Sequence, residues 1–116
     1  MKLYDLKYLE EIAGGDNAFK EEMLKYYIEN TPAVLQTLDK SLNDADWGSF
    51  RFAIHKFTPN LTIVGMTALA GLANRLEVLA TSPDMIGQIP SVYGGFREGL
   101  VNALAELTGD FGYLTK

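Results

Sequence analysis

The chain has 116 residues, of which 47% are hydrophobic and 22% are charged, and its formal net charge at pH 7 is −5. This length fits one domain, residues 1–116, that is large enough to bury a hydrophobic core. The acidic balance makes nucleic acid and anionic membrane surfaces poor partners, because both need a basic face. A single histidine and the lack of cysteine argue against a disulfide framework, a thiolate nucleophile and the usual zinc sites.

The N-terminal segment does not have the features of a targeting signal. It lacks an apolar signal region, and no stretch of the chain approaches the roughly 18 apolar residues of a membrane span. We therefore expect a cytoplasmic protein with no membrane partner.

The first two predicted elements are amphipathic helices. Residues 4–13 form a short helix that Gly14 and Gly15 stop, with three apolar residues at helical spacing: Leu6, Leu9 and Ile12. Asp16 or Asn17 caps a second helix. The predicted core-facing residues of its first half are Phe19, Met23, Tyr26 and Tyr27.

Pro32 interrupts the pattern of this second helix. A new helix could start there, with Thr31 as its cap and the proline in its first turn. The apolar periodicity nevertheless continues through Leu35, Leu38 and Leu42. This continuity favours one helix over residues 16–43 with a kink at the proline.

A third helix, capped by Asp46 and ended by Gly65, carries the only histidine, His55. Five apolar residues fall within roughly 40° of one direction on a helical wheel and predict its core-facing stripe: Phe50, Ile54, Phe57, Leu61 and Val64. His55 points roughly 140° away from that stripe. Three apolar residues lie near it on the face expected to be wet: Phe52, Pro59 and Ile63. An exposed apolar patch around one imidazole needs an explanation.

Two further helices complete the predicted fold. Met66 or Thr67 opens the fourth, whose core-facing residues are Leu69, Leu72, Leu76 and Leu79. Residues 82–90 have the composition of a loop. The last helix spans residues 91–108 with Gly109 as its stop, and its inward residues are Tyr93, Phe96, Leu100, Leu104 and Leu107. The pattern predicts an all-α fold, an antiparallel up-and-down four-helix bundle with a short additional N-terminal helix, and assigns no element to residues 110–116.

The chemistry that these residues allow centres on His55. The chain has no glycine-rich phosphate loop, and a bundle without a nucleophile elbow or oxyanion hole argues against a Ser-His-Asp site. A neutral imidazole can attack a phosphoryl group and later surrender it. The phosphoryl oxygens then need positive charge or hydrogen-bond donors nearby. The neighbours that could supply them are Arg51, Lys56, Thr58 and Thr62.

Several short segments together resemble the histidine phosphotransfer (HPt) domain family. These segments are Asp46-Trp47, residues 53–56 (AIHK) and Gly65, followed by Leu69, Leu72, Leu76 and Glu77. The family's motif places the phosphorylated histidine after a small or apolar pair, with a glycine ten residues later. Residues 6–32 also resemble the family's opening helices. The resemblance covers roughly residues 4–80, with a weaker extension to the last helix.

The resemblance implies that His55 is the phosphoacceptor. The family commonly has a lysine three residues after the histidine and a small residue, usually glycine, four residues after it. Here these positions hold Thr58 and Pro59. Because Thr58 can donate only a neutral hydrogen bond, Lys56 or Arg51 is expected to supply the charge instead.

The resemblance also gives roles to residues around the histidine. Glu77 matches a position that often holds a polar residue bonding the active histidine, so it is expected to fix the ring through one nitrogen; an ordinary exposed carboxylate stays the alternative. The expected docking surface for the receiver domain of a response regulator comprises Phe52, Pro59, Ile63 and Met66. For Ile63 and Met66, packing against the last helix or the turn stays the alternative.

The function implied is that of a phosphoryl carrier between receiver-domain aspartates, downstream of a hybrid sensor histidine kinase. Such a carrier is not an enzyme and holds no cofactor, since the receiver with its Mg²⁺ catalyses the transfer. We expect a monomer, and Met1 with the tail past Gly109 favours a free-standing chain over an excised domain. Two alternatives stay open: a non-phosphorylated interaction module, which Thr58 favours, and a helical bundle whose histidine is incidental.

Overall fold

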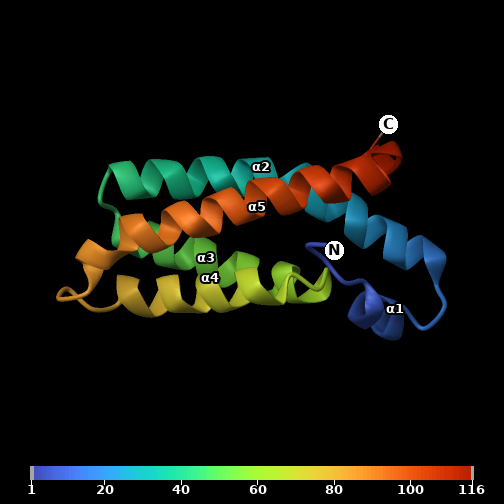
Figure 1. The fold of residues 1–116 in the computed structure, drawn as a ribbon, viewed down its shortest axis with the longest axis horizontal. Coiled ribbons are helices and arrows are strands. Elements are labelled where there is room, and N and C mark those ends of the chain that lie inside the picture. The colour runs from blue at the N-terminus through green and yellow to red at the C-terminus, as the bar shows by residue number, and fades with distance from the viewer. Residues whose placement is uncertain (1, 116) are drawn as a thin grey trace.

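Five α-helices build the fold in the computed structural model, which describes residues 2–115. They are α1 (Lys7–Ala13), α2 (Asn17–Asn43), α3 (Trp47–Ile63), α4 (Thr67–Ala80) and α5 (Ile89–Phe111), with short 3₁₀ turns η1 (Ile86–Gln88) and η2 (Gly112–Thr115). Figure 1 shows α2 to α5 side by side along the long axis and α1 at one end. Residues 2–115 contain no strand. The predicted all-α bundle with a short N-terminal helix is therefore confirmed.

The helix boundaries follow from local capping. The Asp16 carboxylate accepts a hydrogen bond from the Phe19 N–H (3.1 Å) at the start of α2. Asp46 accepts one from the Ser49 N–H (3.1 Å) at the start of α3. Both are N-caps of the expected kind. The helix α2 continues through Pro32, as predicted, and Figure 1 shows it changing direction along its length.

The core lies between the four long helices. All five residues of the stripe predicted for α3 are buried: Phe50, Ile54, Phe57, Leu61 and Val64. Aromatic contacts tie α3 to its neighbours, with Tyr27 of α2 stacked on Phe57 (ring centroids 5.9 Å apart) and Tyr93 of α5 edge-on to Phe50 (5.5 Å). Such pairs add to the stability gained by apolar burial.

Several predictions for the other helices are wrong in detail. Phe19 and Tyr26 are exposed, because the buried stripe of α2 runs along a different phase: Leu24, Tyr27, Ile28, Thr31, Leu35 and Leu38. Ile12 is also exposed. Gly109 does not stop the last helix, which begins at Ile89, with Pro90 in its first turn, and continues to Phe111. The tail then turns back through η2, where Leu114 packs against the core.

A charged cluster joins α2 to α5. Asp39 accepts a hydrogen bond from the Tyr93 hydroxyl (2.6 Å) and is held by Arg97, whose Nε lies 3.0 Å from Oδ1 and whose Nη2 lies 3.0 Å from Oδ2. The Arg97 hydrogen bonds lower the pKa of Asp39, whereas burial, followed by the bond to Asp39, raises the pKa of Tyr93. These contacts link α2 to α5 at the surface of the bundle.

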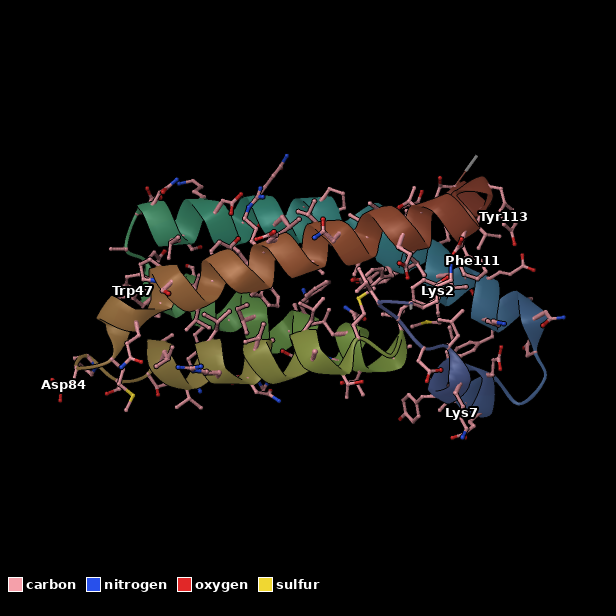
Figure 2. The ribbon with its side chains drawn as sticks, viewed as in Figure 1. Lys2, Lys7, Trp47, Asp84, Phe111 and Tyr113 are labelled. Carbon is pink, nitrogen blue, oxygen red and sulfur yellow. The ribbon has the colours of Figure 1, made fainter. Side chains whose placement is uncertain are left out.

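The N-terminal segment closes one end of the bundle. Lys2 Nζ lies 2.7 Å from the Asp110 carboxylate, and the Tyr4 hydroxyl donates to the same carboxylate. Figure 2 shows Lys2 beside the end of α5, where Phe111 is labelled. Asp5 N–H donates to the Val64 carbonyl (3.3 Å), so the segment also crosses the turn between α3 and α4.

Gly65 occupies that turn for two physical reasons. Its φ is +69°, in the left-handed region that costs an L-residue free energy. A Cβ atom there would lie 1.8 Å from the Asp5 carbonyl oxygen. The glycine that forms part of the sequence motif is therefore needed for the α3–α4 turn itself. Within residues 2–115, no helix combines the length and apolarity needed to cross a membrane.

Candidate functional site

His55 lies on the outer face of α3 and contacts one residue of the neighbouring helix. Its side chain is 74% exposed, and its Nδ1 atom lies 2.8 Å from Oε1 of Glu77 on α4, whose side chain is 20% exposed. An ionised carboxylate only accepts hydrogen bonds, so Nδ1 carries the proton in this pair. The lone pair is then on Nε2, which makes Nε2 the nucleophilic atom of the ring.

Close packing of α3 on α4 explains why Glu77 reaches the ring. Ala70 and Ala73, which precede Glu77 by seven and four positions on α4, are small and buried. Small side chains let two helix axes approach each other. Glu77 lies one turn after Ala73 on the same face, where its side chain extends to the edge of the contact. The carboxylate therefore contacts His55 at the edge of the bundle, largely shielded from solvent.

The ring of His55 borders a shallow hollow on the N-terminal side of α3. Four residues line its volume of about 360 Å³: Gly48, Arg51, Phe52 and His55. None of them follows His55 in the chain. This placement agrees with the geometry of α-helices, in which side chains tilt toward the N-terminus and cover the preceding turn.

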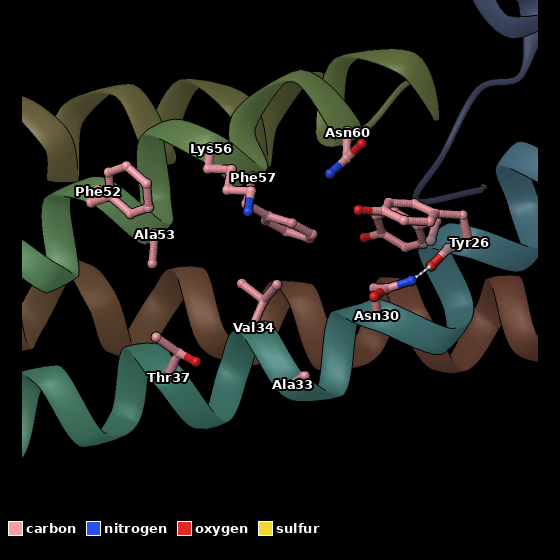
Figure 3. Close-up of a pocket in the computed structure, with 11 residues that line it drawn as sticks. Tyr26, Asn30, Ala33, Val34, Thr37, Phe52, Ala53, Lys56, Phe57 and Asn60 are labelled. Carbon is pink, nitrogen blue, oxygen red and sulfur yellow. Dashed lines mark hydrogen bonds between the residues drawn. The ribbon is translucent and has the colours of Figure 1, made fainter.

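A larger groove runs between α2 and α3 next to this hollow. Its volume is about 460 Å³, and Figure 3 shows the side chains that line it, including Tyr26, Asn30, Val34, Phe52, Lys56 and Asn60. Phe52 lines both the groove and the hollow, and 69% of its surface is exposed. Lys56 belongs to the groove and is not among the residues that line the hollow beside His55.

The structure separates the residues that the sequence grouped around His55. Arg51 and Phe52 lie with the ring in the hollow, while Pro59 and Thr62 are exposed on later turns of α3. Ile63 is half-buried and packs against the core.

Two expected roles are corrected by the contacts that the residues make. The Thr58 hydroxyl donates to the Ile54 carbonyl (2.7 Å), so its single proton is not directed at a phosphoryl group. Met66 is 1% exposed, and its sulfur accepts a hydrogen bond from the buried Tyr27 hydroxyl (2.9 Å). Met66 is therefore part of the core and not of a docking surface.

Sequence reasoning missed some of the residues that line the two cavities. Gly48 lies two turns before His55 on the same face of α3, a spacing that is visible in the sequence. The groove residues Tyr26 and Asn30 come from α2, and their approach to α3 depends on the phase of α2. The apolar pattern of α2 does not reveal which face is buried, because exposed aromatic residues such as Phe19 and Tyr26 interrupt it.

One of three comparisons with known proteins found a match. A model of the Hpt domain family matches residues 22–108, a range that includes His55, Glu77 and all of α3, α4 and most of α5. Comparisons with curated proteins and with solved structures gave no match. The family match covers well over half of the chain, and the chain therefore belongs to the Hpt domain family, whose members are phosphocarriers in histidine phosphotransfer relays.

Proposed function

We propose that this chain carries a phosphoryl group on Nε2 of His55 between receiver-domain aspartates of a multistep phosphorelay. The observation that carries the proposal is the exposure of the His55 ring together with its contact with Glu77. His55 is exposed to a partner, and Glu77 holds Nδ1 at 2.8 Å, so that Nε2 is left with its lone pair. A histidine with an incidental role would not need a half-buried carboxylate from another helix to orient it.

The transfer step needs no proton donor. The Nε2 lone pair attacks the phosphorus of an aspartyl phosphate, an N–P bond forms, and the P–O bond to the aspartate breaks. The aspartate leaves as a carboxylate with the electron pair. The ring keeps its proton on Nδ1 and becomes a positively charged phosphoimidazolium. Glu77 then faces that charge across a charge-assisted hydrogen bond, and the reverse step passes the phosphoryl group to the next receiver.

The partner supplies what this chain does not. In this proposal the receiver contributes the Mg²⁺ and the catalysis of transfer, and a hybrid sensor histidine kinase stands upstream. The receiver docks over Phe52 and Pro59 and against the α2–α3 groove, where an apolar centre is bordered by Asn30, Lys56 and Asn60. Such a mixture of apolar centre and polar rim suits a transient interface. The chain acts as a cytoplasmic monomer.

Incubation with phosphorylated receivers tests the carrier function. Each receiver of the same organism is phosphorylated and mixed with wild-type protein or with His55→Gln, and protein-bound phosphate is scored for acid lability and alkali stability. We expect label on wild type only. Equal absence of label from both proteins with every receiver would refute the carrier function.

A non-phosphorylated interaction module is the second candidate. The observation that favours it is Thr58, which stands where the family commonly has lysine and whose hydroxyl is bonded to Ile54. Receiver binding without label on His55 would support this alternative.

A further inference from the structure

The hollow beside His55 lies over the turns of α3 that precede it. Besides His55, it is lined by the residues three, four and seven positions earlier in the chain: Phe52, Arg51 and Gly48. Gly48 has no side chain, and the nearest heavy atom to a Cβ built there is Asp46 Oδ1 at 3.8 Å, so the glycine leaves the hollow open. A tetrahedral phosphoryl group on the ring would have its oxygens over this preceding turn.

Of the four candidate donors near His55, only Arg51 lines this hollow, and Thr62 lies two turns after the histidine. The Thr58 hydroxyl is bonded to the Ile54 carbonyl at 2.7 Å. Lys56 lines the α2–α3 groove and not the hollow. Arg51 lines the hollow, lies one helical turn before His55, and forms no ion pair with any residue in the range 2–115. Residues one turn apart on a helix have Cβ atoms about 5–6 Å apart, which is within reach of an arginine.

We infer that Arg51 is the cationic residue that binds the phosphoryl oxygens on His55, in place of a lysine on the turn that follows the histidine. The inference rests on the proposed carrier function. The guanidinium presents several N–H donors in a planar fork that matches two oxygens of a phosphoryl group. Charge on the preceding turn thereby performs the task that Thr58 cannot.

The inference also assigns separate tasks to the two exposed cations of α3. Arg51 contacts the phosphoryl group, whereas Lys56 faces the partner that occupies the groove. Glu77 contacts the other ring nitrogen, so that His55 has an acceptor for Nδ1 and a donor for the oxygens on Nε2.

Labelling by a small phosphodonor tests this assignment without a docked partner. Wild type, Arg51→Ala, Arg51→Lys and Lys25→Ala are incubated with phosphoramidate, whose P–N bond breaks with release of ammonia as the bond to His55 forms. We expect Arg51→Ala to slow labelling about tenfold, Arg51→Lys to restore part of the rate because it keeps the charge but not the planar fork, and Lys25→Ala to stay within about twofold of wild type. Lys25→Ala is the matched control because it removes an exposed cation that lines neither the hollow nor the groove.

Salt dependence and folding controls separate charge from structure. The rate ratio of wild type to Arg51→Ala should shrink as sodium chloride rises, because salt screens an exposed charge. Circular dichroism should show equal helix content for all variants. Equal rates for Arg51→Ala and wild type, or a loss in Lys25→Ala as large as that in Arg51→Ala, would overturn the inference alone. A wild type that neither phosphoramidate nor any receiver labels would overturn the carrier function and this inference with it.

Discussion

Nδ1 of His55 lies 2.8 Å from Oε1 of Glu77, and the two residues come from different helices. The contact fixes which ring nitrogen holds the proton and therefore which one can attack. It also places a negative charge where the ring becomes positive on phosphorylation. One carboxylate thus orients the nucleophile and stabilises the charged product.

Glu77→Ala should lose both the orientation of the ring and the negative charge beside it, whereas Glu77→Gln should lose only the charge. The glutamine carbonyl can still accept from Nδ1, so we expect receiver-dependent labelling to fall about tenfold or more in the alanine variant and less in the glutamine variant. Initial rates of labelling measure this order. Nitrogen NMR of the ring provides an independent readout, since the Nδ1–H tautomer should predominate in wild type and lose its preference in Glu77→Ala. Equal tautomer populations in the two proteins would contradict the orienting role.

The face of α3 that carries His55 could be predicted from the sequence, because five apolar residues at helical spacing fix which side of the helix is buried. The α2 side of the site could not. Its N-terminal half alternates exposed aromatics such as Tyr26 with buried Leu24 and Ile28, so side-chain hydrophobicity alone does not give the phase. Only the packing of α2 against α3 places Asn30 and Tyr26 in the groove.

Thr58 and Met66 illustrate a second limit of sequence reasoning. A threonine on an α-helix can donate its hydroxyl to the carbonyl four residues back, and Thr58 does so with Ile54. Met66 follows Gly65, and the turn directs its side chain inward to Tyr27. Both outcomes depend on local geometry that residue type alone leaves undetermined.

Gly65→Ala should destabilise the fold by about 2 kcal/mol or more. The positive φ strains an alanine, and its Cβ would lie 1.8 Å from the Asp5 carbonyl oxygen, so the N-terminal segment must shift. Urea unfolding followed by circular dichroism measures the loss. Gly71→Ala is the matched control: it lies within α4 with no atom within 4 Å of the added Cβ, and should be neutral or stabilising by up to about 1 kcal/mol. Equal stabilities for the two variants would refute the explanation given for Gly65.

Asp39→Asn should lower the free energy of unfolding at neutral pH but not in acid. The folded state lowers the pKa of Asp39 through Arg97, so the stabilisation is present above the ordinary carboxyl pKa and disappears as the pH falls through the lowered value. For this partly exposed pair we expect a loss of about 1 kcal/mol at pH 7 after allowing for solvent screening. Urea unfolding at pH 7 and again below pH 3 measures the difference. Asp44→Asn, which breaks only an exposed contact with Lys40, should lose less. A deficit that persists undiminished in acid would show that the charge of Asp39 is not its source.

Phe52→Ala should weaken receiver binding without affecting the fold. Phe52 is 69% exposed, lines both the hollow and the groove, and lies one turn from His55, so a docked receiver would bury it at the centre of the interface. Truncating a central aromatic residue of an interface typically costs about 1–2 kcal/mol or more, which corresponds to a rise in Kd of about fivefold to thirtyfold or more. Titration calorimetry with the receiver that labels His55 measures the change, and thermal unfolding verifies the fold. Tyr113→Ala is the matched control, because this aromatic is 63% exposed but belongs to η2, which packs on α2 and α5 rather than on α3. If both substitutions weaken binding equally, the receiver does not dock around Phe52.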